Sequence, residues 1–399
     1  MQTLEGALEL LLSHVRPVAQ AEEVGLWDAL GRVAAEDVTS PMAVPPFDRS
    51  PLDGYCLHSE DVSGASREHP SALRVIGEAC AGCGERFHPA RGEAVRVMTG
   101  APVPPECDCV IRQEDTDGGE DTVRVYQGVP SGRNICRAGE DVAVGAVIVR
   151  GGERLTSAHI GVLASVGLPR VKVLRRVRAA LLCTGDELAQ PGEPLPFGRI
   201  YDANRSILAA RLIELGVETK LLRSEADEPE RVAEALARAA ENADVLITTG
   251  GVSVGKKDIF HRVLPLMGAE RLFWKVAMKP GTPLLCGLYQ GRLIICLSGN
   301  PFAALACFEL FAKPVLMRLA GCAGEVNPRV RARLAGSFGK ASPGRRLIRA
   351  RFDGERVRVM GANHSSGSLS SMIGCNCLID IPAGSGALAE GDEVEIVLL

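Results

Sequence analysis

The chain has 399 residues, with 45 lysines and arginines against 49 aspartates and glutamates, and a formal net charge of -4. This length exceeds that of a usual single domain, so it predicts several domains with sizeable apolar cores. The charges are balanced along the chain, which excludes the basic footprint of a nucleic-acid-binding protein. No apolar run is long enough to span a membrane.

The N-terminus "MQTLEGALELLLSHVRPVAQ" lacks a basic leading region, and its leucines recur at helical spacing. This pattern predicts an amphipathic helix rather than a signal peptide. The thirteen cysteines are an odd number, and many lie in apolar runs such as "ALLCTG". Such thiols suit a reducing compartment, so we expect a cytoplasmic protein.

One cysteine pair, Cys80 and Cys83 in "CAGC", has the spacing of a zinc or redox site. Zinc needs more ligands, and the nearest candidates, Cys107 and Cys109, stand in a different loop context. Unpaired thiols in a Gly-rich turn are therefore the favoured interpretation, with a metal or redox role as the alternative.

The first part of the chain predicts a β domain inserted into a helical one. Residues 46–139 are dense in glycine, proline and short β-rich runs. Helical or turn-rich segments flank them on both sides, at 1–45 and 140–172. We expect these flanks to form one elongated helical or linker domain.

Residues 173–322 alternate strand-like and helix-like segments, which predicts a three-layer α/β domain with a mostly parallel sheet. Residues 323–399 again give short strands separated by turns, a pattern that suits a C-terminal β barrel. The expected fold class is thus a multidomain α/β plus β protein.

The Gly-rich stretch "TTGGVSVGKKD" follows a predicted strand of the α/β domain. Ligands of a parallel sheet bind beyond the carboxyl ends of its strands, where glycines let backbone N–H groups approach an anion. We expect this loop to bind phosphate, with hydroxyl donors among its residues. Asp258 at its end either holds Mg²⁺ or caps the following helix. The loop residues expected to bind are Thr249, Gly250, Gly251, Ser253 and Gly255.

Two more loops are expected at the same sheet edge. "CTGDELAQPG" places Asp186 and Glu187 directly after a strand. "LSGNPFAA" places Ser298, Gly299, Asn300 and Pro301 between a strand and a helix. Three polar strand ends that converge on one crevice predict a binding site there.

"WKVAMKPGTP" supplies Lys275 and Lys279, which share a face if the segment is a strand, with Val276 and Met278 on the other face. Two ammonium groups on one face suit an anion, and the alternative is an exposed strand face. In the β domain, "PPFDRSPLDGYC" and "VRVMTGAPVP" are turns by composition, with Asp53 and Thr99 as their polar candidates.

Seven motifs in this order, covering nearly the whole chain, resemble the molybdopterin molybdenumtransferase family, which includes bacterial MoeA and the gephyrin E domain. They are "PPFDRSPLDGY", "VRVMTGAPVP", "TGDEL", "YDANRSIL", "TTGGVSVGKKD", "KVAMKPGTP" and "SGNPFAA". The loop "LSGNP" departs from the family in having Ser298 where proline is common.

The resemblance implies the last step of molybdenum cofactor synthesis. Adenylylated molybdopterin is bound, AMP is hydrolysed off, and the dithiolene sulfurs ligate molybdate with the help of Mg²⁺. It also implies a homodimer, in which the β domain of one subunit closes the α/β site of the other. A molybdopterin adenylyltransferase and apo-molybdoenzymes are the further partners expected, with no nucleic acid and no membrane.

Six residues match catalytic positions of the family: Asp53, Thr99, Glu187, Asp258, Lys275 and Lys279. Glu187, Asp227 and Asp258 match acidic positions connected with Mg²⁺, and Asp141 matches a further acidic position. Neutralised phosphoryl oxygens and a positioned water would suffice for such a hydrolysis. A molybdopterin adenylyltransferase and a non-catalytic pterin-binding scaffold are the alternative functions. The choice between molybdenum and tungsten stays open.

Overall fold

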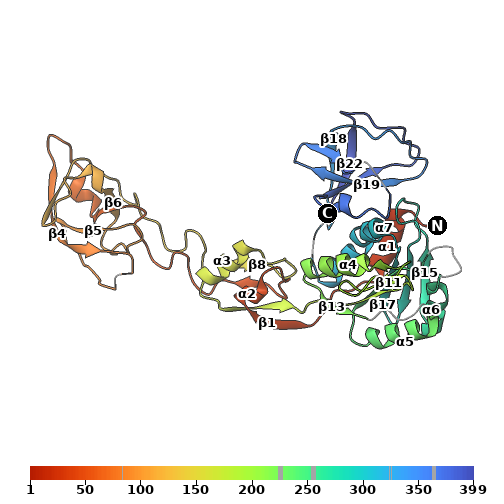
Figure 1. Cartoon of the computed structure of the whole chain (residues 1–399). Coiled ribbons are helices and arrows are strands. Elements are labelled where there is room, and N and C mark those ends of the chain that lie inside the picture. Colours follow the sequence, from red (N-terminus) through yellow and green to blue (C-terminus); the bar gives the residue numbers. More distant parts are fainter. Residues whose placement is uncertain (83, 223–227, 253–257, 323, 325, 362–364) are drawn as a thin grey trace.

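The computed structural model describes all residues except 83, 223–227, 253–257, 323, 325 and 362–364. The molecule is elongated (Figure 1): a β-rich unit lies at one end, and an α/β domain with a β barrel lies at the other. A narrow unit of short strands and helices connects them. No helix within the described part of the chain combines the length and apolarity of a membrane span.

A six-stranded sheet forms the centre of the α/β domain. Its strands, in spatial order, are β13 (Glu218–Leu221), β10 (Arg178–Cys183), β14 (Val245–Thr249), β17 (Arg292–Leu297), β16 (Leu285–Tyr289) and β15 (Glu270–Trp274). The first four run parallel, β16 runs antiparallel to β17, and β15 runs antiparallel to β16. The carboxyl ends of β10, β14 and β17 therefore lie side by side at one edge, as the alternation of strand-like and helix-like segments predicted.

Helices cover both faces of this sheet because its strands alternate apolar side chains. Leu181 and Ile247 face one core, whereas Leu182 and Leu246 face the other. The first core is covered by α4 (Ala203–Glu214), α7 (Pro301–Cys307), a π-helical turn (Phe308–Ala312) and α8 (Lys313–Leu319), and the second by α5 (Pro229–Ala240) and α6 (Phe260–Met267).

Helix α1 (Leu4–Ser13) begins at the N-cap Thr3, whose hydroxyl accepts the N–H of Gly6. Its buried residues Leu4, Ala7 and Leu11 join the first core of the α/β domain. The helix thus packs with the α/β domain, whereas the sequence placed residues 1–45 together in the linker domain. The spacing of apolar residues predicts which face of a helix is buried, but it does not predict the domain against which this face packs.

The narrow unit is built by segments from both sides of the insertion. Strand β1 (Ala21–Gly25) pairs antiparallel with β9 (Arg170–Leu174), and β2 (Val38–Thr39) pairs with β8 (Val147–Val149). Helices α2 (Leu26–Ala29) and α3 (Ser157–Ser165) complete a small core with these strands. The chain therefore leaves this unit and returns to it after forming the β domain.

The β domain contains a five-stranded sheet in the spatial order β6, β3, β5, β4, β7. The strands are β3 (Gly54–Leu57), β4 (Ser71–Ala79), β5 (Glu93–Val97), β6 (Cys109–Arg112) and β7 (Thr122–Val125), with short 3-10 turns at Ser59–Val62 and Gln113–Asp115. Two apolar clusters fill it, one on each face of β3.

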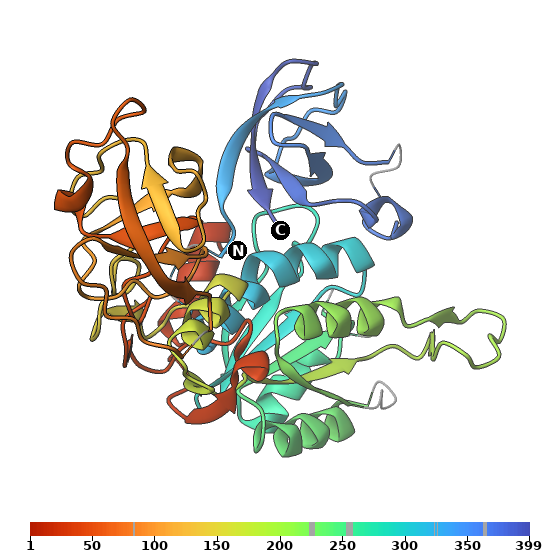
Figure 2. The ribbon, with the colours of Figure 1, turned by 90° about the vertical axis from the view of Figure 1, so that its left-hand side faces the viewer.

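The C-terminal strands close into a five-stranded barrel, as the sequence predicted. They are β18 (Arg329–Leu334), β20 (Arg356–Val359), β19 (Arg346–Phe352), β21 (Cys377–Ile381) and β22 (Glu393–Leu398), with a 3-10 turn at Ser370–Met372. The barrel lies above the α/β domain (Figure 2). In the same view, the segment with β11 (Leu188–Ala189) and β12 (Ile200–Tyr201) projects away from the α/β domain.

Candidate functional site

Three loops meet at the carboxyl edge of the parallel strands. A Cβ at Gly250 would come within 2.3 Å of the carbonyl oxygen of Thr184, and the backbone of Gly250 has a φ of +92°. A Cβ at Gly299 would lie 3.6 Å from the Cα of Gly250. The loops after β10, β14 and β17 are thus in direct contact, and only glycine permits the closest approach. This is the convergence that the sequence predicted.

Asn204, in the first turn of α4, ties these loops together. Its Nδ2 donates to the Oγ1 of Thr249 at 3.0 Å and to the carbonyl oxygen of Gly299 at 2.7 Å. Because a carbonyl oxygen only accepts, this contact fixes the orientation of the amide. The sequence analysis did not select Asn204 as a site residue. Its motif "YDANRSIL" nevertheless marks the start of α4, because Asp202 caps this helix by accepting the N–H of Arg205.

Thr249 has a different role from the one expected. Its hydroxyl donates to the carbonyl oxygen of Ser298 at 2.8 Å and accepts from Asn204. The side chain is buried, and its one proton is already used between two loops. Thr249 therefore holds the loops in place, and its role as a hydroxyl donor to a ligand stays a prediction. Ser253 and Gly255 lie outside the described residues.

Buried oxygen atoms without a hydrogen-bond partner surround this crossing point. They include Thr184 Oγ1 after β10, Asn204 Oδ1 at the start of α4, and Asp258 Oδ2 before α6. A buried polar atom without a partner costs about 1–3 kcal/mol, so such atoms are rare in folded proteins. Their gathering around one sheet edge is the arrangement expected of a binding site, in which a ligand provides the missing partners.

The segment 275–279, which we call the lysine strap, connects β15 to the loop before β16. Val276 and Met278 are buried, as expected, while Lys275 is half-buried and Lys279 is exposed. The strap is not a regular strand, however, because Lys275 has a positive φ of 71°. The ammonium of Lys275 lies 4.0 Å from the centroid of the Trp274 ring.

Trp274 links the lysine strap to the Gly-rich loop. Its Nε1 donates to the carbonyl oxygen of Val252 at 3.4 Å, and its ring meets that of His261 edge to face at 4.5 Å. Lys275 is thereby placed beside the loop after β14, whereas Lys279 lines a cavity on the side of the barrel. The expectation that both lysines share a strand face does not describe this geometry.

The cavity beside Lys279 has a volume of about 640 Å³ and lies between the α/β domain and the barrel. The α/β domain contributes Lys279, Ser298 and Asn300, and the barrel contributes Lys340, Arg346 and Arg349. Four cationic side chains in one cavity suit an oxyanion. The sequence did not predict that barrel residues line this cavity. The arginine-rich stretch "RRLIRARF" suggests a strand, but local sequence does not predict the domain that a strand contacts.

Arg349 is held rigidly within this cavity. It is 1% exposed, its guanidinium lies 4.3 Å from the centroid of the Phe302 ring, and it donates to the carbonyl oxygens of Ser365 and Ser368. Burial lowers the pKa of Arg349 below its usual value. The contact with Phe302, at the start of α7, joins the barrel to the loop after β17.

The expected carboxylate site is only partly visible. Glu187 is exposed after β10, Asp258 is half-buried with one oxygen unpartnered, and Asp227 lies outside the described residues. Where the structure describes the chain, no cluster of three or more histidine, cysteine, aspartate or glutamate residues could hold a metal. The orphan oxygen of Asp258 nevertheless fits an oxygen-ligated cation such as Mg²⁺.

Asp53 and Thr99 form a pair on the surface of the β domain. The Oδ1 of Asp53 accepts the backbone N–H of Thr99 at 2.7 Å and its hydroxyl at 2.8 Å. These bonds, the backbone one above all, lower the pKa of Asp53 below its usual value. The β domain lies at the opposite end of the molecule from the lysine strap (Figure 1), so one chain alone does not bring this pair to the sheet edge.

The cysteines of the β domain do not form a zinc site in the described chain. Cys80 is exposed and Cys83 lies outside the described residues, whereas Cys107 and Cys109 are buried in the apolar core. Burial raises the pKa of Cys109 to about 12, so this thiol stays protonated. Asp141, the further acidic position, is exposed in the linker.

Family models match the chain in three consecutive stretches. They are the MoeA N-terminal region (domain I and II) over residues 2–167, a probable molybdopterin binding domain over 180–318, and the MoeA C-terminal region (domain IV) over 331–399. The molybdopterin molybdenumtransferase of Staphylococcus aureus (strain MSSA476) is 35% identical over 380 residues, which cover 94% of this chain and 90% of that protein.

The chain belongs to the molybdopterin molybdenumtransferase family. The molybdopterin molybdenumtransferase 2 of Mycobacterium tuberculosis (strain H37Rv) is 36% identical over 392 residues, covering 97% of this chain and 96% of that protein. The crystal structure of the MoeA protein of Pyrococcus horikoshii OT3 superposes with a TM-score of 0.86 at 30% identity, over all of both chains. A second structure of MoeA from that species gives a TM-score of 0.83 at 33% identity, covering 99% of this chain and 98% of the other.

Proposed function

We propose that this chain is a molybdopterin molybdenumtransferase, which hydrolyses adenylylated molybdopterin and transfers molybdate to the freed dithiolene. The observation that carries the proposal is the junction of two sites. The unpartnered oxygens at the Gly-rich loops lie next to the cationic cavity beside Lys279. The two places are connected by Asn204, Ser298 and Gly299. A pterin nucleotide in the first and an oxyanion in the second would meet at the loop after β17.

In the hydrolysis, water attacks the phosphorus of the AMP group, and the bond from phosphorus to the molybdopterin oxygen breaks. The ammonium of Lys275 is the proposed partner of the phosphoryl oxygens, whose negative charge it would stabilise, and backbone N–H groups of the Gly-rich loop are proposed as further donors. Asp258, with its unpartnered oxygen, and Glu187 are the proposed holders of Mg²⁺, together with Asp227. When bound, Mg²⁺ would neutralise charge on the phosphate.

Molybdate is proposed to occupy the cavity of Lys279, Lys340, Arg346 and Arg349. Its tetrahedral dianion requires several cations at once, and Arg349 is already fixed by Phe302 and by two carbonyl oxygens. Tungstate has the same charge and shape, so both oxyanions belong in the test. The oxyanion is a substrate here, which distinguishes it from the Mg²⁺ that assists.

We further propose a homodimer, in which the β domain of a second copy brings Asp53 and Thr99 to the sheet edge. The pair needs a second copy because the β domain lies at the far end of its own chain (Figure 1). Large apolar side chains remain exposed in a single chain, among them Trp27 at 88% on the narrow unit. Burial of such side chains is the ordinary driving force of subunit association.

We place the reaction in the cytoplasm, because most of the described cysteines are buried in apolar cores, where thiols suit a reducing compartment. There a molybdopterin adenylyltransferase would supply the substrate, and apo-molybdoenzymes would accept the product. The alternative functions, an adenylyltransferase or a non-catalytic scaffold, leave the barrel cations or the orphan oxygens without a role.

The test is AMP release from adenylylated molybdopterin with Mg²⁺ under anaerobic conditions, with molybdate, tungstate or no oxyanion. Release that depends on an oxyanion supports the transferase and ranks the two metals. Consumption of ATP with free molybdopterin would identify an adenylyltransferase instead, and tight pterin binding without release would identify a scaffold.

A further inference from the structure

The lysine strap is held from both sides by segments that are distant in sequence. On one side, the N–H of Gln2 donates to the carbonyl oxygen of Lys275 at 3.0 Å, and the N–H of Ala277 donates to the carbonyl oxygen of Gln2 at 2.8 Å. The N-terminal segment thus runs beside the strap as a parallel bridge. The residues before α1 therefore help to build the site.

On the other side, the barrel holds Lys279 by its backbone. The N–H of Lys279 donates to the carbonyl oxygen of Arg345 at 2.9 Å, and its carbonyl oxygen accepts from the N–H of Leu347 at 2.8 Å. Both backbone polar groups of Lys279 therefore bond to the edge of β19. Arg346, between these two barrel residues, lines the same cavity as Lys279. A shift of this edge would move both cations together.

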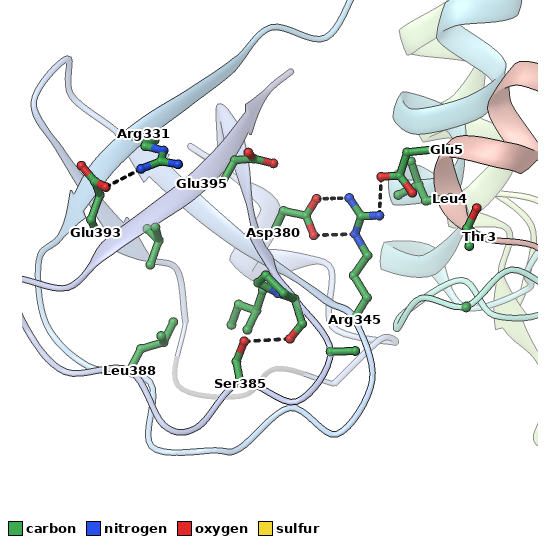
Figure 3. Close-up of a pocket in the computed structure, with 15 residues that line it drawn as sticks. Thr3, Leu4, Glu5, Arg331, Arg345, Asp380, Ser385, Leu388, Glu393 and Glu395 are labelled. Atoms are coloured by element: carbon green, nitrogen blue, oxygen red, sulfur yellow. Dashed lines mark hydrogen bonds and ion pairs between the residues drawn. The ribbon is translucent and has the colours of Figure 1, made fainter.

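The side chain of Arg345 fixes this edge (Figure 3). Its Nε and Nη2 donate to the two oxygens of Asp380 at 2.8 Å and 2.6 Å, and its Nη1 donates to Glu5 at 2.5 Å. Asp380, on β21, is 4% exposed, and Glu5 lies in the first turn of α1. Arg345 therefore connects the barrel to the helix whose N-terminal extension holds the other side of the strap.

Ion pairs support this joint in addition to apolar packing, in which Leu347 of the barrel shares a core with Leu4 of α1 and Met278 of the strap. A cavity of about 760 Å³ lies beside Glu5, Arg345 and Asp380 (Figure 3). Bidentate pairs between arginine and carboxylate are directional, and a buried one loses little to solvent screening. The orientation of this guanidinium therefore helps to set the position of the barrel edge against α1.

We propose that Arg345 is a positioning residue, which fixes the lysine strap and Arg346 in the arrangement that the oxyanion requires. The inference rests on the proposed function, in that Lys279 and Arg346 are taken to contact molybdate. Arg345 itself faces Glu5 and Asp380 and is not among the described residues that line the cavity of Lys279. Its replacement should therefore affect the oxyanion more than the nucleotide.

The test compares Arg345→Gln with a matched control, Arg331→Gln. Arg331 lines the same cavity of about 760 Å³ and pairs with Glu393, but this pair does not touch the strap. Asp380 keeps its contact with Arg329 at 2.8 Å when Arg345 is replaced, so the buried carboxylate is not left unpaired. Glu5→Gln, at an exposed position, provides a second variant, which removes the charge from only one of the contacts of Arg345.

We expect Arg345→Gln to raise the KM for molybdate about tenfold while binding of adenylylated molybdopterin stays within about twofold. Arg345→Lys should recover only part of this loss, because an ammonium cannot bond to both oxygens of Asp380 as a fork. Arg331→Gln should behave as the wild type. Equal KM values for Arg345→Gln and Arg331→Gln would overturn the proposal.

Hydrogen exchange provides a readout that does not depend on activity. The amides of Ala277 and Lys279 should exchange faster in Arg345→Gln and, to a smaller extent, in Glu5→Gln, because their acceptors move. Unchanged exchange there would contradict the positioning role. If the wild type shows no molybdate-dependent reaction but exchange still responds to Arg345, the proposed function fails and the positioning of the strap stands.

Discussion

The side-chain amide of Asn204 donates to the carbonyl oxygen of Gly299 at 2.7 Å and so connects the start of α4 to the loop after β17. The same amide also reaches Thr249 at the end of β14. One residue therefore sets the spacing between the proposed nucleotide region and the loop that leads to the oxyanion cavity, while its own Oδ1 remains without a partner.

Replacement of Asn204 by aspartate should reduce kcat/KM for adenylylated molybdopterin by about 10- to 100-fold. The carboxylate would face the carbonyl oxygen of Gly299 without a donor, so the loops would separate. Steady-state AMP release measures this loss. Asn242→Asp, in a turn away from the site, serves as the control. Normal turnover by Asn204→Asp would show that the loops do not depend on this amide.

Gly250→Ala should abolish the site even if the chain folds. The added Cβ would meet the carbonyl oxygen of Thr184 at 2.3 Å, in addition to the strain of a φ of +92°. Gly268→Ala is the matched control: it has a φ of +71° at the end of α6, but no atom lies within 4 Å of the added Cβ. Titration with adenylylated molybdopterin should show binding to the control and none to Gly250→Ala. Equal affinities would mean that the loops do not require this contact.

Asp244 should make stability depend on pH in acid. Burial alone would raise its pKa, but hydrogen bonds from Arg175 and from the backbone N–H of Arg178 outweigh burial and lower the pKa below its usual value. The stabilisation is thus complete above the pKa of the unfolded chain, at about 4, and is lost as the pH falls through the lower folded value.

Asp244→Asn should therefore lower Tm at pH 7, and the difference from the wild type should shrink as the pH falls below about 4. Thermal unfolding followed by circular dichroism between neutral pH and pH 3 measures this. A difference in Tm that stays constant over the whole range would exclude the ion pair with Arg175 as its cause.

Subunit mixing tests whether the site is shared between two copies. Asp53→Ala and Lys279→Ala should each be inactive alone. In a coexpressed equal mixture, half of the dimers would be heterodimers with one intact site of two, so about a quarter of wild-type activity should return. A mixture of Asp53→Ala with Thr99→Ala, whose defects lie on the same β domain, should recover none. Absence of recovery in both mixtures would contradict the shared site.

Local sequence patterns predicted the sheet and its three loops, because strand ends and glycine turns are encoded by neighbouring residues. Gly250 and Gly299 were found in this way. The lysine strap was misjudged as a strand, since its shape comes from pairing with Gln2 and Arg345, far away in the chain. The barrel cations Arg346 and Arg349 were missed for the same reason: contacts between domains, rather than local preference, bring them to Lys279.

Lys279→Ala is the decisive variant for the proposed hydrolysis of adenylylated molybdopterin and transfer of molybdate. In single-turnover reactions with Mg²⁺, the wild type should release AMP when molybdate is added, and Lys279→Ala should bind the nucleotide normally but lose this response. Release by Lys279→Ala at the wild-type rate, or release by the wild type that does not change when molybdate is added, would contradict the proposed function.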